Sequence, residues 1–342
     1  MGCAIEFDAV SIVFGDTPEA ALSLMDQGQT RSEVQAATGQ VLGVHNCSLE
    51  VDEGEILVLM GLSGSGKSTL LRAVNALNPV VRGAVHVTTP AGRINVTAAT
   101  GEALRRVRQT SVSMVFQQFG LLPWRSVREN VWLGLELAGV ERAARARKTE
   151  EQLELVGLAD WAERKVGELS GGMQQRVGLA RAFATDAPIL LMDEPFSALD
   201  PLIRTRLQDE LLDLQTRLKR TILFVSHDLD EAFRLGNRIA IMEGGRIVQC
   251  GTPQEIFRAP ATEYVAEFVA HMNPLGVLVA EDVMGPRQDA PTARQVEARA
   301  PLSEVMVLMA AQAHPVLVTR NGAPVGEITA EGVFARLLNP GA

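Results

Sequence analysis

The chain has 342 residues, a length that predicts about two domains. Hydrophobic residues make up 46% and charged residues 21%, a globular balance that excludes wholesale disorder. The net charge of −9 and the 4% of aromatic residues argue against nucleic acid as a partner. Three scattered cysteines, Cys3, Cys47 and Cys250, indicate neither a disulfide framework nor a metal site, and favour a reducing compartment. The sequence shows neither a signal-peptide pattern nor a run of about 18 apolar residues. We therefore expect a cytosolic protein that could act at a membrane only through a partner.

The first third of the chain reads as strands around a polar insert. Residues 4–14 and 44–60 are predicted strands, and residues 84–96 are a predicted hairpin. Between the first two strands lies a helix-prone insert at about 16–42. Residues 56–60 form a continuous apolar run, as expected of a strand buried on both faces of a parallel sheet. A helix is predicted to follow and to end at Asn78-Pro79.

The middle of the chain alternates helices with buried strands. A helical subdomain is expected at about 118–170, with a capping box that begins at Ser126. Strands are predicted at 189–192 and 221–226, and between them Asp200 caps a helix. The apolar stripe of that helix comprises Ile203, Leu207, Leu211, Leu214 and Leu218. This alternation predicts an α/β domain with a mostly parallel sheet.

Residues 61–69 carry a complete phosphate-loop pattern between a buried strand and a helix. Its glycines let backbone N–H groups converge on phosphate oxygens, and the helix adds the positive end of its dipole. Lys67 is expected to reach the β- and γ-phosphates of ATP, and the Ser68 hydroxyl to ligate Mg²⁺. The alternative is a flexible Gly-Ser loop without a ligand. The predicted nucleotide contacts are Gly61, Ser63, Gly64, Ser65, Gly66, Lys67, Ser68 and Thr69.

Three further candidates follow predicted parallel strands, whose carboxyl ends meet at one edge of the sheet. Asp193 is placed to hold Mg²⁺ through water, and Glu194 to orient or deprotonate an attacking water. His227 is expected to contact the γ-phosphate. The alternatives are an ordinary acidic loop and a structural histidine. A fourth candidate is the segment LSGGMQQR (169–176), which by itself is either a simple helix cap or an anion site.

Taken in order, these motifs resemble the ATP-binding-cassette (ABC) ATPases over residues 4 to about 270. The ordered set is the phosphate loop, MVFQQFGLLP (114–123), LSGGMQQR (169–176), LLMDEP (190–195), SALD (197–200) and SHD (226–228). The resemblance implies a P-loop NTPase with a parallel core sheet, an antiparallel β subdomain and a helical subdomain. It also implies that two copies sandwich two ATP molecules head to tail.

The resemblance extends roles to further residues. Ser170, Gly171 and Gly172 would contact the γ-phosphate held by the other copy, and Asp200 would link the two sites. Gln117 would sense Mg²⁺ and the attacking water. Phe14 falls where the family places an aromatic ring against adenine, although a core position is the alternative. With Lys67, Glu194 and His227, Gln117 completes the predicted catalytic set.

Three longer phrases, including the insert, resemble the ATPase subunits of bacterial importers for quaternary amines such as choline, glycine betaine and proline betaine. They are residues 14–39, 58–78 and 196–215. Such subunits lie peripherally on the cytoplasmic face of the inner membrane, with a permease and a periplasmic binding protein. The permease groove would lie between the Gln117 loop and residues 126–166. The alternatives are an importer for another small solute, a soluble ABC ATPase acting on ribosomes or DNA, and a small-molecule phosphotransferase.

The expected organisation is an ATPase domain at 1–272, a linker region at 273–300 and a small α+β module at 301–342, with 278 as an alternative start. Residues 302–338 resemble one cystathionine-β-synthase-type (CBS-type) module with its turn at Asn321-Gly322. Such a module either senses a ligand or only promotes dimerisation.

Overall fold

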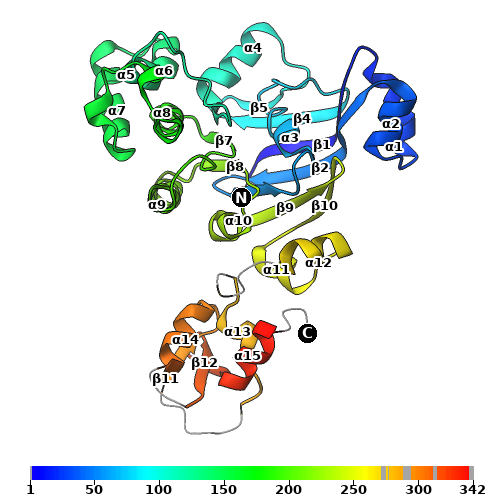
Figure 1. Cartoon of the computed structure of the whole chain (residues 1–342), viewed down its shortest axis with the longest axis vertical. Helices are drawn as coiled ribbons and strands as arrows, with labels where there is room; N and C mark the ends of the chain where they lie inside the picture. Colours follow the sequence, from blue (N-terminus) through cyan, green and yellow to red (C-terminus); the bar gives the residue numbers. More distant parts are fainter. Residues whose placement is uncertain (1, 271–274, 276, 288–293, 311–313, 339–342) are drawn as a thin grey trace. The chain divides into compact units, whose positions relative to one another are not determined.

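The computed structural model describes the chain except for residues 1, 271–274, 276, 288–293, 311–313 and 339–342, and the side chain of Leu214. Contacts within the chain divide it into two compact units (Figure 1). The first unit comprises residues 1–227 and 240–247, and the second comprises residues 228–239 and 248–342.

A six-stranded sheet in the order β10-β9-β3-β8-β7-β6 forms the centre of the fold. Its strands are β3 (Ile56–Met60), β6 (Val112–Val115), β7 (Ile189–Asp193), β8 (Thr221–Val225), β9 (Arg238–Glu243) and β10 (Arg246–Gly251). Strands β3, β8, β7 and β6 run parallel. Every residue of β3, β7 and β8 is buried, as their unbroken apolar runs predict. The mostly parallel core sheet is therefore confirmed.

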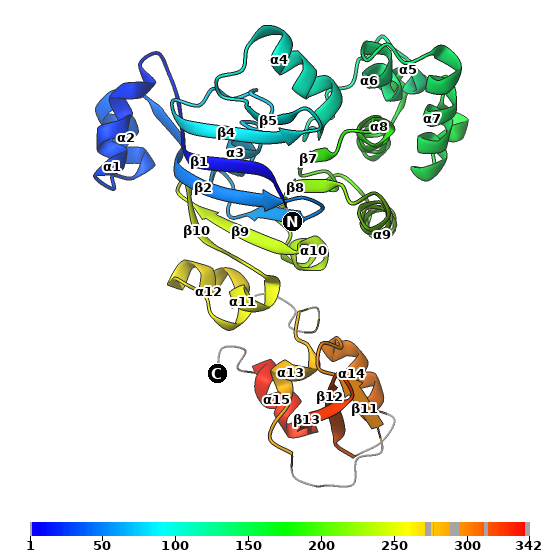
Figure 2. The same cartoon turned by 180° about the vertical axis from the view of Figure 1, so that it is seen from behind.

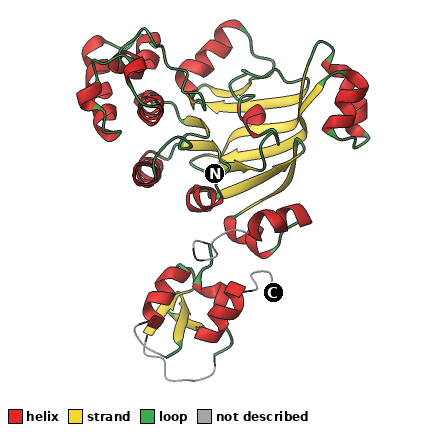
Figure 3. Cartoon of the chain, in the orientation of Figure 1, coloured by secondary structure: helices red, strands yellow, loops and turns green. Residues whose placement is uncertain are grey.

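An antiparallel sheet in the order β2-β1-β4-β5 forms a second layer (Figure 3). Its strands are β1 (Cys3–Phe14), β2 (Val41–Asp52), β4 (Arg82–Thr89) and β5 (Gly92–Asn95), so the predicted hairpin is confirmed. The strand predicted over 44–60 is instead two strands, because the chain turns at Gly54, whose φ is +74°. Helix α3 (Lys67–Leu71) packs against strands of both sheets (Figure 2).

Helix α3 is shorter than predicted. It ends at Leu71 instead of continuing to Asn78. Beyond it, the Ala73 and Val74 N–H groups bond to carbonyls three residues back, which tightens the chain out of the α-helix. Ala76 then adopts a φ of +53°, a left-handed conformation that cannot continue a right-handed helix.

The remaining helices of the first unit lie around the two sheets (Figures 1 and 2). They are η1 (Pro18–Ala21), α1 (Leu22–Asp26), α2 (Arg31–Thr38), α4 (Gly101–Arg106), η2 (Val107–Ser111), α5 (Val127–Val131), α6 (Leu133–Leu137), α7 (Arg142–Leu155), η3 (Ala159–Trp161), η4 (Val166–Glu168), α8 (Gly171–Ala184) and α9 (Pro201–Leu218). The capping box at Ser126 and the Asp200 cap are confirmed. Of the stripe on α9, Leu207 and Leu211 are buried, but Leu218 is 53% exposed because it lies in the last turn, beyond the core.

The second unit contains α10 (Leu229–Leu235), α11 (Pro253–Arg258), α12 (Glu263–Ala270), α13 (Ala280–Val283), β11 (Arg294–Glu297), α14 (Leu302–Ala310), β12 (Val316–Arg320), β13 (Ala323–Ile328) and α15 (Ala330–Leu338). A three-stranded sheet has the order β11-β12-β13 and turns at Asn321-Gly322, both with positive φ. The region expected to be a linker contributes α13 and β11, and β11 pairs with β12. The parts of that region at 273–274, 276 and 288–293 lie outside the described residues.

Candidate functional site

The phosphate loop connects β3 to α3, as the sequence predicts. Gly61 has a φ of +139°, and a Cβ there would lie 2.1 Å from the Met242 carbonyl oxygen, so only glycine fits. Lys67 is buried, and its Nζ donates to the carbonyl oxygens of Gly61 at 2.8 Å and Leu62 at 3.0 Å. Burial lowers the pKa of Lys67, and the carboxylates of Glu194 and Asp193 offset part of that effect.

Asp193 lies at the end of β7 with its side chain fully buried. Its Oδ1 accepts a hydrogen bond from Ser68 Oγ at 2.6 Å. Its Oδ2 accepts from Arg72 Nη2 at 2.8 Å and from Arg72 Nε at 3.2 Å. Of the three residues predicted to contact Mg²⁺, Ser68 and Asp193 are thus neighbours, and their hydroxyl and carboxylate oxygens are the ligand types that this ion prefers.

Glu194 lies at the centre of a second group. Its Oε2 accepts a hydrogen bond from Gln117 Nε2 at 2.9 Å and lies 3.5 Å from Nδ1 of His227. Its φ of +48° is unusual for a residue with a side chain. The backbone carbonyl of Glu194 also accepts from Gln175 Nε2 at 3.3 Å. A carboxylate held between an amide and an imidazole can accept a proton from a nearby water.

Ser68 of the first group and Gln117 and Glu194 of the second line one cavity of about 320 Å³, whereas Asp193, Arg72 and His227 do not line it. Glu194 and Gln117 line it together with the phosphate loop and Phe14, whose ring is 39% exposed. Phe14 therefore does not occupy the core position that was the alternative reading. The cavity is lined by Phe14, Arg31, Val41, Leu42, Gly43, Ser63, Gly64, Gly66, Lys67, Ser68, Thr69, Gln117 and Glu194.

The signature segment lies apart from this cavity. Ser170 caps α8 by accepting a hydrogen bond from the Met173 N–H at 3.4 Å, and both Ser170 and Gly171 are exposed. Gly172 lies beside the neighbouring loop, where a Cβ would be 3.2 Å from the Ala198 carbonyl oxygen. Asp200 is exposed and caps α9 through the Ile203 N–H at 3.1 Å. Within one chain, none of these residues lines the phosphate-loop cavity.

Sequence reasoning missed three residues that shape the site. Arg72 follows Ser68 by one helical turn and therefore lies on the same helix face, a spacing that could have identified it. Gln175 binds both the Glu194 carbonyl and the Ala198 N–H, and only the fold brings these groups together. Arg31 comes from the insert, and its presence at the phosphate loop has no local signal in the sequence.

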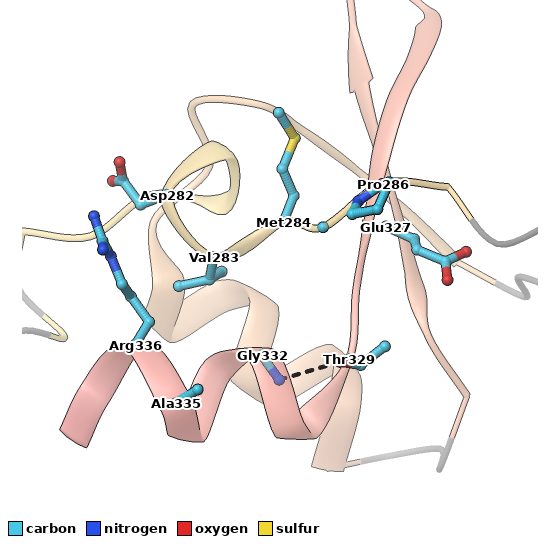
Figure 4. Close-up of a pocket in the computed structure, with 10 residues that line it drawn as sticks. Asp282, Val283, Met284, Pro286, Glu327, Thr329, Gly332, Ala335 and Arg336 are labelled. Atoms are coloured by element: carbon cyan, nitrogen blue, oxygen red, sulfur yellow. Dashed lines mark hydrogen bonds between the residues drawn. The ribbon is translucent and has the colours of Figure 1, made fainter. Parts of the chain in front are cut away.

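A separate cavity of about 370 Å³ lies within the second unit (Figure 4). Met284, Pro286, Thr329 and Gly332 are among its lining residues, and Gly332 donates its N–H to Thr329 Oγ1 at 3.1 Å. Glu327 also lines this cavity, and its buried carboxylate oxygens have no hydrogen-bond partner among the described residues. None of the nucleotide-binding, metal-binding or catalytic residues predicted from the sequence lines this cavity.

Two further observations concern membrane-spanning helices and the cysteines. Among the described helices, none combines the length and hydropathy needed to cross a bilayer. Within the described part of the chain none of the three cysteines forms a disulfide: Cys47 is buried, Cys3 is half-buried and Cys250 is exposed.

Comparison with known proteins agrees with this geometry. The model of a family described as ABC transporter matches residues 44–197. The glycine betaine transport ATP-binding protein OpuAA of Bacillus subtilis is 49% identical over 82% of this chain, which spans 66% of that relative's length. ProV of Escherichia coli, named a glycine betaine/proline betaine transport system ATP-binding protein, is 47% identical over 83% of this chain and 70% of its own.

A third relative, the trimethylamine N-oxide transport system ATP-binding protein TmoW of Ruegeria pomeroyi, is 41% identical over 95% of this chain and 94% of its own. Among solved structures, the dimeric structure of a bacterial ABC transporter cassette superposes with a TM-score of 0.63 at 29% identity, covering 72% of this chain and 98% of that one. The same cassette was also solved with bound ADP and phosphate. The phosphate loop, the adjacent carboxylates of Asp193 and Glu194 and the identity to these relatives all agree. The chain therefore belongs to the ABC transporter family as an ATP-binding ATPase.

Proposed function

We propose that this chain is the ATP-hydrolysing subunit of an importer for a small methylated amine. Three relatives support this, since their names specify transport of glycine betaine, proline betaine or trimethylamine N-oxide. The first two solutes and choline share a quaternary ammonium group, and trimethylamine N-oxide shares the methylated nitrogen. The observation that carries the proposal is the single cavity lined by the phosphate loop, Gln117 and Glu194.

The triphosphate binds along the phosphate loop. Lys67 exchanges its two backbone carbonyl partners for the β- and γ-phosphates, whose charge compensates for the burial of the ammonium group. The adenine stacks on the ring of Phe14, an exposed residue that lines the same cavity. The remaining contacts come from Gly61, Ser63, Gly64, Ser65, Gly66, Ser68 and Thr69.

Hydrolysis uses Glu194 as the general base. Its carboxylate accepts a proton from the attacking water as the oxygen bonds to the γ-phosphorus and the bond to ADP breaks. Gln117 and His227, both next to Oε2 of Glu194, orient that carboxylate; His227 contacts the γ-phosphate, and Gln117 contacts the attacking water. Ser68, Asp193 and Gln117 would hold Mg²⁺, which neutralises phosphate charge when bound.

A second copy completes each site. Ser170 and Gly171 are exposed at the N-terminus of α8, Gly172 is half-buried beside them, and none of the three lines the cavity of its own chain. In a head-to-tail dimer they cap the γ-phosphate of the partner's ATP, and Asp200 lies between the two sites. ATP then joins the copies, and loss of the γ-phosphate releases them. The solved cassette with a TM-score of 0.63 is itself dimeric.

A permease docks beside the helical subdomain. A cavity of about 360 Å³ lies between the segment before Gln117 and that subdomain. Phe116, Leu133 and Leu137 give it apolar walls, as suits a helix from another subunit.

The protein would lie on the cytoplasmic face of the inner membrane and act with a periplasmic binding protein. The proposed ATPase domain covers 1–272, and residues from 278 or 301 onward form one CBS-like module that pairs with its counterpart or binds a ligand.

The ATPase roles are tested in two purified variants. With saturating MgATP, Glu194→Gln should form a stable dimer and hydrolyse ATP at less than about a hundredth of the wild-type rate. Lys67→Ala should lose both nucleotide binding and dimer formation. A Glu194→Gln protein that stays monomeric in light scattering would contradict the sandwich.

Solute class is tested by uptake in a strain lacking this chain. Radiolabelled glycine betaine, choline and trimethylamine N-oxide should accumulate when the wild type is restored, but not with Glu194→Gln. Proline uptake serves as the control. Normal uptake of all three methylated amines without the chain, with altered ribosome profiles or DNA repair, would favour the soluble ABC ATPase instead.

A further inference from the structure

The insert between β1 and β2 is a fixed part of the first unit. Ala21, Met25 and Val34 form a small buried cluster with residues of β1 and β2. Asp26, at the end of α1, also pairs with Arg82 on β4, where Arg82 Nη1 lies 2.8 Å from Asp26 Oδ2. The position of helix α2 relative to the phosphate loop is therefore determined by packing.

This packing brings Arg31 to the nucleotide cavity. Arg31 is the first residue of α2, where a capping box between Thr30 and Glu33 sets the start of the helix. Its Nη1 donates to the carbonyl oxygen of Gly64 in the phosphate loop, and its Nη2 donates to that of Gly43 on β2. One guanidinium thus connects the insert, the antiparallel sheet and the phosphate loop.

The charge and partial burial of Arg31 point to an anionic ligand. Among the described residues that line the cavity, Arg31 and Lys67 are the two cations. Burial lowers the pKa of Arg31, but a guanidinium remains charged at neutral pH even so. Its Nε–H is buried and has no hydrogen-bond partner in the described part of the chain. A buried charge with an unused donor is costly unless a ligand compensates for it.

The neighbours of Arg31 indicate which part of the nucleotide it would meet. A Cβ on Gly43 would lie 2.9 Å from the Phe14 ring and 3.0 Å from Thr69 Cγ2. Arg31 therefore contacts the phosphate loop and Gly43, the glycine of β2 that packs beside Phe14, the proposed adenine-stacking residue. We propose that Arg31 is a nucleotide-binding residue, which holds the Gly64 carbonyl of the phosphate loop and supplies positive charge to the ribose and α-phosphate. This inference rests on the proposed nucleotide site.

The test is equilibrium binding of ATP and ADP to the full chain by calorimetry. Arg31→Ala should weaken both nucleotides about tenfold and equally, because the ribose and α-phosphate are common to them. Arg31→Lys should recover most of the affinity, whereas Arg31→Gln, which can still donate to a carbonyl but carries no charge, should not. Arg82→Ala is the matched control: it removes the ion pair to the insert outside the cavity and should change affinity less than about twofold.

Each contrary result has a distinct meaning. Binding by Arg31→Ala within about twofold of wild type, while Lys67→Ala loses binding, overturns the role of Arg31 and leaves the proposed site intact. Equal losses of affinity in Arg31→Ala and Arg82→Ala would show that packing of the insert, and not the charge of Arg31, causes the loss. Equal affinities of Arg31→Lys and Arg31→Gln would show the same. Either result would overturn the proposed role of Arg31. Normal binding by Lys67→Ala would instead refute the nucleotide site itself. Thermal melting of each variant checks that it is folded.

Discussion

The pair formed by Asp193 and Arg72 predicts an unusual asymmetry between two mutations. Asp193 is completely buried, whereas the side chain of Arg72 is 36% exposed. Arg72→Ala leaves a buried carboxylate whose remaining contact is the Ser68 hydroxyl, so we expect a loss of about 3–5 kcal/mol in the free energy of unfolding. Asp193→Ala leaves a cation that water can reach, so we expect a smaller loss of about 2–3 kcal/mol.

A double-mutant cycle measures the interaction directly. Removing Asp193 from the Arg72→Ala variant should cost little, because the unpaired buried carboxylate is then gone, so the coupling free energy should be about 2 kcal/mol, close to the loss from Asp193→Ala alone. Urea unfolding without nucleotide or Mg²⁺, followed by tryptophan fluorescence, is suitable because Trp124, Trp132 and Trp161 all lie in the first unit. A coupling below about 0.5 kcal/mol, or an Asp193→Ala variant less stable than Arg72→Ala, would refute the reasoning.

Three further predictions follow from local environments. Burial raises the pKa of Cys47 to about 11, so iodoacetamide at pH 8 should label exposed Cys250 and reach Cys47 only after denaturation, as mass spectrometry would reveal. Hydrogen bonding by Arg82 lowers the pKa of Asp26, so its stabilising effect is present above its ordinary pKa and is lost as the pH falls below it. Urea midpoints between about pH 5 and pH 3 should therefore fall less in Asp26→Asn than in wild type; an identical slope would contradict this. Lys219 ends α9 with a φ of +48°, so Lys219→Gly should stabilise the protein by about 0.5–1 kcal/mol in the same assay, and a loss of stability would count against backbone strain there.

Local patterns allowed much of the fold to be predicted from the sequence. The buried strands are recognisable because a strand covered on both faces must be apolar throughout, as β3, β7 and β8 are. The phosphate loop is recognisable because a backbone curled around phosphate admits only glycine at positions such as Gly61. The helix caps at Ser126 and Asp200 depend on residues within a single turn.

Features that depend on distant residues required the tertiary structure. Arg72 meets Asp193 across 121 positions of the chain, and Arg31 reaches Gly64 across 33. Leu218 is exposed because the core ends before the last turn of α9, which the periodicity of the sequence does not encode. By itself, the sequence determined which residues could bind phosphate, because that chemistry resides in neighbouring residues. The fold alone decided which carboxylate, amide and guanidinium groups surround them, because those contacts form through space.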